Sequence, residues 1–177
     1  SWGAGFRPTD VPEFLALNPN AMVPVIKDGE FVLWESNTIC RYLASKHGRD
    51  DLLPAAPMER ARVEQWMDWQ AGELNNAWRY AFMALVRNSA MHTDAAAIAI
   101  SIESWNRHIG ILDKQLSKTG AYAVGPDFTL ADVVLGLSVN RWLMTPFARP
   151  EYPAVSGYME RLGDREGFRL HCCNGIA

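Results

Sequence analysis

The sequence predicts a small α/β segment followed by an all-helical bundle. Two short apolar runs flank an Asp-Gly pair near the start, which is a strong β-hairpin signal. Residues 50–57 carry Pro54 and Pro57 and show no apolar period. Beyond them, apolar residues recur at steps of three and four, the period of amphipathic helices. We therefore expect an α/β domain over 1–49, a linker over 50–57 and a helical domain over 58–177.

The α/β segment begins with a short helix and the hairpin. Thr9 or Asp10 can cap the helix, which has Pro12 in its first turn, a position where proline is favoured. The hairpin pairs residues 23–26 with residues 31–34. One hairpin alone is marginally stable in water. The segment therefore needs either packing partners or further strands upstream.

A longer helix follows the hairpin. Glu35, Ser36 and Asn37 open it, apolar residues continue at helical spacing, and Gly48 is placed to end it. A glycine at that point can adopt the left-handed conformation that commonly stops a helix.

The helical part predicts four helices. The first extends from about Pro57 to Asn88, and the second ends near Gly120. The second is the most regular, because its apolar residues repeat at steps of 4-3-4-3-4: Ile98, Ile102, Trp105, Ile109, Leu112 and Leu116. Thr129 and Asp132 match a capping box at the start of the third helix. The fourth contains Val155, Tyr158, Met159 and Leu162.

Charge, cysteine content and hydropathy exclude several classes of protein. The 17 basic and 20 acidic residues give a net charge of −3, whereas nucleic acids and anionic membranes need a concentrated basic face. Three cysteines are too few for the disulfide framework of a secreted protein, and an odd number cannot all pair within one chain. No apolar run is long enough to span a membrane. We expect a cytoplasmic protein without nucleic-acid or membrane partners.

Five features in one order resemble the cytosolic glutathione S-transferase family of bacterial type. They are Asn18-Pro19, Val23-Pro24, the hairpin, Glu35-Ser36, and Phe128-Thr129-Leu130-Ala131-Asp132. The resemblance implies a partial thioredoxin-like domain followed by the all-helical domain of that family. It also implies that the first β-α-β unit precedes Ser1, together with the catalytic Ser, Tyr or Cys. The catalytic residue is therefore expected upstream of this sequence.

The resemblance further implies a glutathione-binding site in the α/β segment. The Val23-Pro24 bond would be cis, so that Val23 offers its main-chain groups to the cysteinyl part of glutathione. Ser36 and the free N–H groups at its helix end would hold the γ-glutamyl carboxylate. Glu35 would pair with the α-ammonium, and Asn37 would be a weaker contact. The alternatives are an ordinary trans proline at a strand start and a Ser36 that only caps its helix.

In the helical part, Trp78, Phe82 and Met83 lie where the family builds its pocket for the second substrate. Plain core packing is the alternative, because large residues at helical spacing are mostly core. We interpret Thr129 and Asp132 as a structural motif of the family rather than as catalytic residues.

We expect no metal site and no cysteine nucleophile. His171 precedes Cys172 and Cys173, but this group lacks a fourth ligand and the usual spacing. We place it in a mobile tail. Cys40 lies on an expected core face, where a thiol is inert.

The resemblance thus predicts a homodimeric transferase that joins glutathione, as co-substrate, to a small hydrophobic electrophile. One alternative is a non-catalytic relative that binds ligands or acts as a scaffold. Another is a glutathione-dependent disulfide reductase that uses an upstream cysteine.

Overall fold

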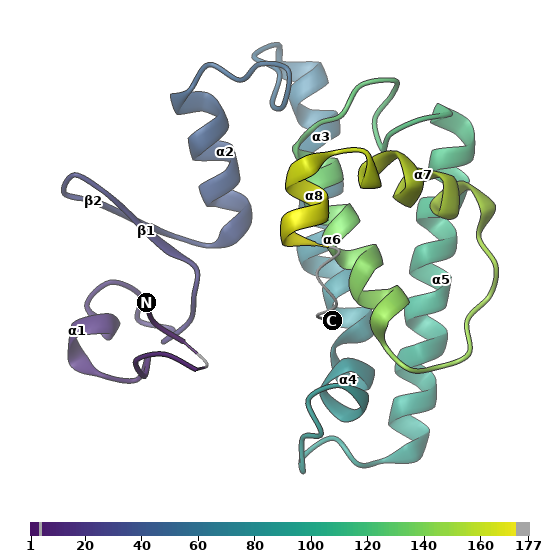
Figure 1. Ribbon diagram of the computed structural model, residues 1–177, viewed down its shortest axis with the longest axis horizontal. Coiled ribbons are helices and arrows are strands. Elements are labelled where there is room, and N and C mark those ends of the chain that lie inside the picture. Colours follow the sequence, from purple (N-terminus) through teal and green to yellow (C-terminus); the bar gives the residue numbers. More distant parts are fainter. Residues whose placement is uncertain (4, 173–177) are drawn as a thin grey trace. The chain divides into compact units, whose positions relative to one another are not determined.

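The computed structural model describes residues 1–3 and 5–172 (Figure 1). The chain divides into two compact units, Ser1–Asp50 and Asp51–Ala177, which we call the α/β unit and the helical unit. The first holds a two-stranded sheet and the second is helical. The predicted fold class, an α/β part followed by an all-helical part, is confirmed.

The α/β unit contains α1 (Pro12–Leu15), β1 (Val25–Asp28), β2 (Phe31–Trp34) and α2 (Ser36–Lys46). β1 and β2 pair antiparallel, with Val25 opposite Trp34 and Asp28 opposite Phe31. The first strand begins two residues later than the sequence predicts. The physical reason is Pro24, which has no N–H to donate to a strand partner.

The predicted start of α1 is wrong, whereas the predicted end of α2 is confirmed. The N-cap of α1 is Val11, so the prediction of Thr9 or Asp10 is wrong. The end of α2 is as expected, since Gly48 has a φ of 61° just beyond the helix.

The helical unit contains α3 (Pro57–Trp69), η1 (Gln70–Leu74), α4 (Asn75–Leu85), α5 (Ala95–Thr119), α6 (Leu130–Met144), α7 (Pro153–Gly163) and α8 (Glu166–His171). The prediction of one regular helix over 57–88 is wrong. A π-helical turn separates α3 from α4, and α4 ends at Leu85. Such turns insert an extra residue and interrupt the regular helical spacing.

Side-chain bonds explain the position of this turn. The Gln70 amide donates to Asn75 Oδ1 at 2.9 Å and to Ser138 Oγ of α6 at 2.9 Å. Gly72 lies within the turn, and glycine disfavours regular helix. The two hydrogen bonds of the buried Gln70 side chain, together with Gly72, therefore favour a π-helical turn over a regular α-helical one here.

The core of the helical unit lies among α3, α5, α6 and α7, with α4 beside α5. Its fully buried side chains include Met67, Trp105, Ile109, Leu112, Leu135, Tyr158 and Leu162. α5 ends at Gly120, which has a φ of 80°, as the sequence predicts. Residues 51–56 of the expected linker fall within this compact unit. Leu53 is buried, and Leu52 O accepts a hydrogen bond from Leu130 N at 2.9 Å.

α8 corrects the prediction of a mobile tail. Phe168 is buried and packs over Gly136 of α6, where an added Cβ would come within 3.0 Å of the Phe168 ring. The same Cβ would come within 2.6 Å of Leu162 Cδ1, so glycine allows α7 and α8 to pack closely on α6. Cys172 caps α8 and is half-buried, while Cys173 lies outside the described residues. Across the described part of the chain, no helix combines the length and apolar character needed to cross a membrane.

Candidate functional site

The strand register brings the two predicted glutathione-binding segments together. Val25 pairs with Trp34 at the open end of the hairpin. In an antiparallel pair, the residue before one strand lies beside the residue after the other. Pro24 and Glu35 therefore flank the same end of the sheet, although eleven positions separate them in the sequence. The α/β unit thus gathers Val23, Pro24, Glu35 and Ser36 in one region.

Asn18 fixes the loop that precedes Val23. Its side chain is only 3% exposed and donates to Met22 O at 2.7 Å. Its Oδ1 accepts from the main-chain N–H of Asn20 at 3.0 Å. An Asn side chain that bonds the backbone two residues on is typical of tight turns. The sequence shows Asn18 only as part of a turn signal and does not reveal that it anchors this loop.

The Val23-Pro24 peptide bond is cis, so this prediction is confirmed. Both residues are exposed, and Val23 is 50% accessible. Ala21 shortly before them has a φ of 54°. Val23 and Pro24 therefore lie at the surface of the α/β unit.

The N-terminus of α2 is open and its first residue is exposed. Glu35 is the N-cap, and no side chain caps this helix end. Ser36 is the first helical residue rather than the cap, so the capping alternative does not describe it. Glu35 and Ser36 are exposed and Asn37 is half-buried. Free N–H groups at such an end, together with the helix dipole, attract anions.

Glu35 has an unusual backbone conformation, with φ at 73° and ψ at 111°. Positive φ is uncommon for residues other than glycine and costs about 1–3 kcal/mol. Strained residues of this kind cluster at ligand-binding sites. The conformation of Glu35 is therefore an independent indication of function at this end of the hairpin.

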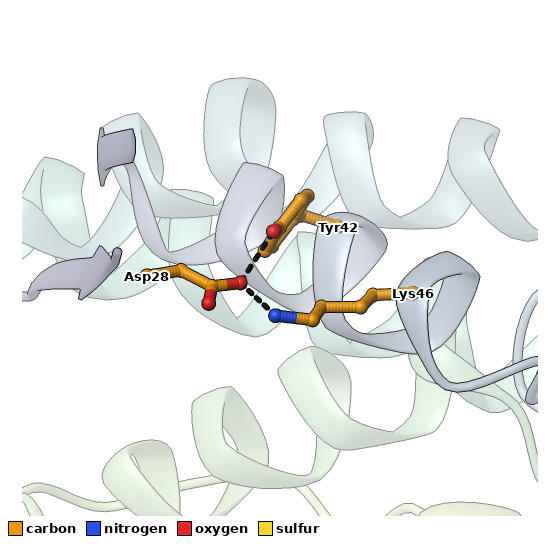
Figure 2. Close-up of polar contacts among 3 residues, drawn as sticks. All are labelled: Asp28, Tyr42 and Lys46. Atoms are coloured by element: carbon orange, nitrogen blue, oxygen red, sulfur yellow. Dashed lines mark hydrogen bonds and ion pairs between the residues drawn. The ribbon is translucent and has the colours of Figure 1, made fainter. Parts of the chain in front are cut away.

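A three-residue polar cluster links the hairpin to α2 (Figure 2). Tyr42 Oη donates to Asp28 Oδ2 at 2.5 Å, and Lys46 Nζ donates to the same oxygen. The Lys46 bond, followed by the Tyr42 bond, lowers the pKa of the Asp28 carboxyl. The bond to Asp28 raises the pKa of both Tyr42 and Lys46. Sequence reasoning missed this cluster, although Tyr42 and Lys46 are four residues apart and share a helix face.

The three residues predicted to line the second-substrate pocket differ in burial. Phe82 is 5% exposed, as the core-packing alternative expects, whereas Trp78 and Met83 are half-buried. The rings of Trp78 and Phe82 meet edge to face with centroids 5.2 Å apart. Arg141 of α6 lies over the Trp78 ring at 4.6 Å. Sequence reasoning did not single out this arginine.

Thr129 and Asp132 form a capping box at the start of α6. Asp132 is fully buried and accepts from Thr129 N at 2.8 Å, from Ala123 N at 2.9 Å and from Tyr158 Oη at 3.1 Å. Burial raises the pKa of Asp132, and these hydrogen bonds oppose that effect. Burial and the Asp132 charge hold the pKa of Tyr158 well above its usual value. With all its contacts inside the core, Asp132 is placed to stabilise the fold.

The described residues hold no group of three or more His, Cys, Asp or Glu side chains arranged to bind a metal ion. Burial raises the pKa of the Cys40 thiol, which keeps it in the unreactive protonated form.

Family models and curated relatives both identify similarity to glutathione S-transferases. The family model for the glutathione S-transferase N-terminal domain matches residues 4–45, and that for the C-terminal domain matches residues 95–161. Glutathione S-transferase GstB of Escherichia coli K12 is 34% identical over 159 residues, which cover 89% of this chain and 76% of the relative. Glutathione S-transferase 1 of Manduca sexta is 30% identical, with 89% and 71% covered.

A solved structure is similar over the whole length of this chain. It is the theta class glutathione S-transferase of Xanthomonas axonopodis pv. citri with glutathione bound. Its TM-score is 0.90 at 34% identity, and the match covers 100% of this chain and 84% of that one.

Proposed function

The chain belongs to the glutathione S-transferase family, and from that premise we propose how it binds and uses glutathione. The resemblance found in the sequence is thereby confirmed, and so is its function as a transferase. The reaction joins the sulfur of glutathione to an electrophilic carbon. The glutathione thiolate forms the new thioether bond while the leaving group departs with the electrons of the broken bond.

The main support for this proposal is that Val23-Pro24 and Glu35-Ser36 lie at the same end of the hairpin. We assign the main chain of Val23 to the cysteinyl part of glutathione. The N-terminus of α2 and the Ser36 hydroxyl bind the γ-glutamyl carboxylate. Glu35 pairs with the α-ammonium beside it, and Asn37 is a further contact.

These residues act by positioning. A free thiol has a pKa near 8.5, and the thiolate is the nucleophile. A bound and oriented glutathione reacts as if its local concentration were much higher. None of the residues assigned here lowers the pKa of the thiol.

The second substrate is a small hydrophobic electrophile that contacts Trp78, Phe82 and Met83 of α4. The half-buried Trp78 ring, which packs edge to face on the buried Phe82, and the half-buried Met83 offer an apolar surface for such a molecule. We further propose that the protein is a cytoplasmic homodimer, as the resemblance implies.

The test is conjugation of glutathione to an aryl halide by the purified protein, with Ser36→Ala and Thr38→Ala compared. Thr38 is also exposed in the first turn of α2. Losing a hydrogen bond to a charged group should raise the KM for glutathione about tenfold in Ser36→Ala. Thr38→Ala should keep the KM of the original protein. Equal KM values for both variants would contradict the assignment of Ser36.

A further inference from the structure

Two arginines flank the aromatic pair of α4. The Arg141 guanidinium lies 5.3 Å from the centre of the Phe82 ring, and the Arg87 guanidinium lies 5.4 Å from the same centre. Arg141 comes from α6, whereas Arg87 follows the end of α4. Two positive charges thus gather around one buried phenyl ring.

Neither arginine has a polar partner for its side chain among the described residues. Arg141 Nε is buried without a hydrogen-bond acceptor, and no described carboxylate pairs with either guanidinium. Burial and the nearby charge of Arg87 lower the pKa of Arg141. Charged groups are rarely buried unless they are paired. Arg141 therefore lacks an anion that would neutralise it, and Arg87 adds a second positive charge beside it.

Other half-buried arginines of the helical unit do have acceptors. Arg161 donates to Ala121 O at 2.7 Å through Nη2. Arg149 Nε is also buried without an acceptor, but its Nη2 donates to Thr145 O at 2.5 Å. Arg141 has no such acceptor among the described residues, and its guanidinium faces the Trp78 and Phe82 rings. Cation–π contacts alone leave the planar fork of donors unused.

We propose that Arg87 and Arg141 bind a carboxylate on the second substrate, whose apolar body rests against the half-buried Trp78 ring. This inference rests on the proposed function, because it names the class of electrophile that the same aromatic surface accepts. A guanidinium binds a carboxylate through two parallel hydrogen bonds, which fixes orientation as well as charge. The substrates preferred by this protein are therefore acidic aryl or alkyl electrophiles rather than neutral ones.

Two electrophiles that differ only in charge test the proposal. They are 4-chloro-3,5-dinitrobenzoate and its methyl ester. In both reactions, the glutathione thiolate forms a C–S bond at the ring carbon that bears chlorine, and chloride leaves with the electrons of the C–Cl bond. We expect the protein to show the higher kcat/KM for the carboxylate, after correction for the uncatalysed rates. A preference that falls as salt is added would agree with a charge contact.

The variants are Arg141→Gln and Arg87→Gln, with Arg79→Gln as the matched control. Arg79 is exposed on α4 and carries the same charge. Each of the first two variants should lower kcat/KM for the carboxylate about tenfold and leave the ester within about twofold. Arg79→Gln should leave both substrates unchanged. Arg87 is exposed, so its variant decides the question if Arg141→Gln does not fold.

Binding without turnover separates this proposal from the proposed function. Calorimetry with 3,5-dinitrobenzoate and its methyl ester needs no reaction. Tighter binding of the acid that both arginine variants abolish would support the anion site, even if neither chloro compound were conjugated. That failure of conjugation would count against the transferase assignment alone. Equal binding of acid and ester, or an acid preference that survives in both variants, would overturn the proposal.

Discussion

The two units of the chain are stabilised in different ways. In the described part of the α/β unit, the buried apolar side chains are Phe14, Ile39 and Ala44, whereas the helical unit buries apolar residues along most of its helices. The α/β unit relies on polar contacts at Asn18 and Asp28. Few buried apolar residues support its candidate glutathione-binding end. Polar substitutions there should therefore alter glutathione binding, while substitutions inside the helical unit should alter stability.

The largest effect is expected from Asp132→Ala in the helical unit. It leaves the buried N–H groups of Thr129 and Ala123 without an acceptor. The free energy of unfolding should fall by about 3 kcal/mol. Urea unfolding measures this, with the exposed Asp127→Ala as a control that should change it by less than about 0.5 kcal/mol. A similar loss in both variants would show that Asp132 has no special role.

Asn18→Ala tests the opposite expectation in the α/β unit. It removes the bonds that hold residues 18–22 in place before Pro24. The KM for glutathione should rise, and local stability should fall by about 1–2 kcal/mol. Asn18→Asp keeps an acceptor for Asn20 N but loses the donor to Met22 O. Its KM and its stability should therefore lie between those of the original protein and those of Asn18→Ala. An unchanged KM in Asn18→Ala would break the contrast between the units.

The sequence predicts the helical unit well because its elements are long and periodic. The apolar repeat of α5 and the glycine at its end are both visible in the sequence. The π-turn at Gln70 is not, because it depends on a bond to Ser138, 68 residues away. α8 was also missed, since a helix of six residues shows little periodicity and depends on packing against Gly136.

The candidate site was predictable only in part. The motifs at Val23-Pro24 and Glu35-Ser36 identify the segments, and the hairpin register explains why they meet. The conformation of Glu35 could not be predicted, because positive φ is unusual for glutamate. The contact of Arg141 with Phe82 could not be predicted either, because Arg141 belongs to α6 and Phe82 belongs to α4.

Glu35→Gly should separate stability from binding within the α/β unit. Glycine adopts positive φ without strain, so the free energy of unfolding should rise by about 1 kcal/mol. The KM for glutathione should rise as well, because the carboxylate that we propose as the partner of the α-ammonium is gone. Thermal unfolding and steady-state kinetics measure the two effects. A variant that is less stable than the original would show that the Glu35 conformation is not strained.

The smallest effect concerns the Asp28 cluster and depends on pH. Hydrogen bonds from Lys46 and then Tyr42 lower the pKa of Asp28 below its ordinary 3.8. Its contribution to stability is therefore complete above the unfolded pKa and is lost as the pH falls through the lower folded value. At the alkaline end, the raised pKa of Lys46 means that its contribution persists until the pH passes above 10.5.

Asp28→Asn should therefore lower the Tm at neutral pH, and the difference from the original protein should shrink below pH 4 or so. Glu30→Gln is the control, because Glu30 is almost fully exposed and lies 4.0 Å from its partner Lys27. That variant should change the Tm little at any pH, since exposed ion pairs contribute little. A constant Tm difference for Asp28→Asn across the acid range would mean that the cluster acts through its neutral hydrogen bonds. The stability of the α/β unit would then not depend on the charge of Asp28.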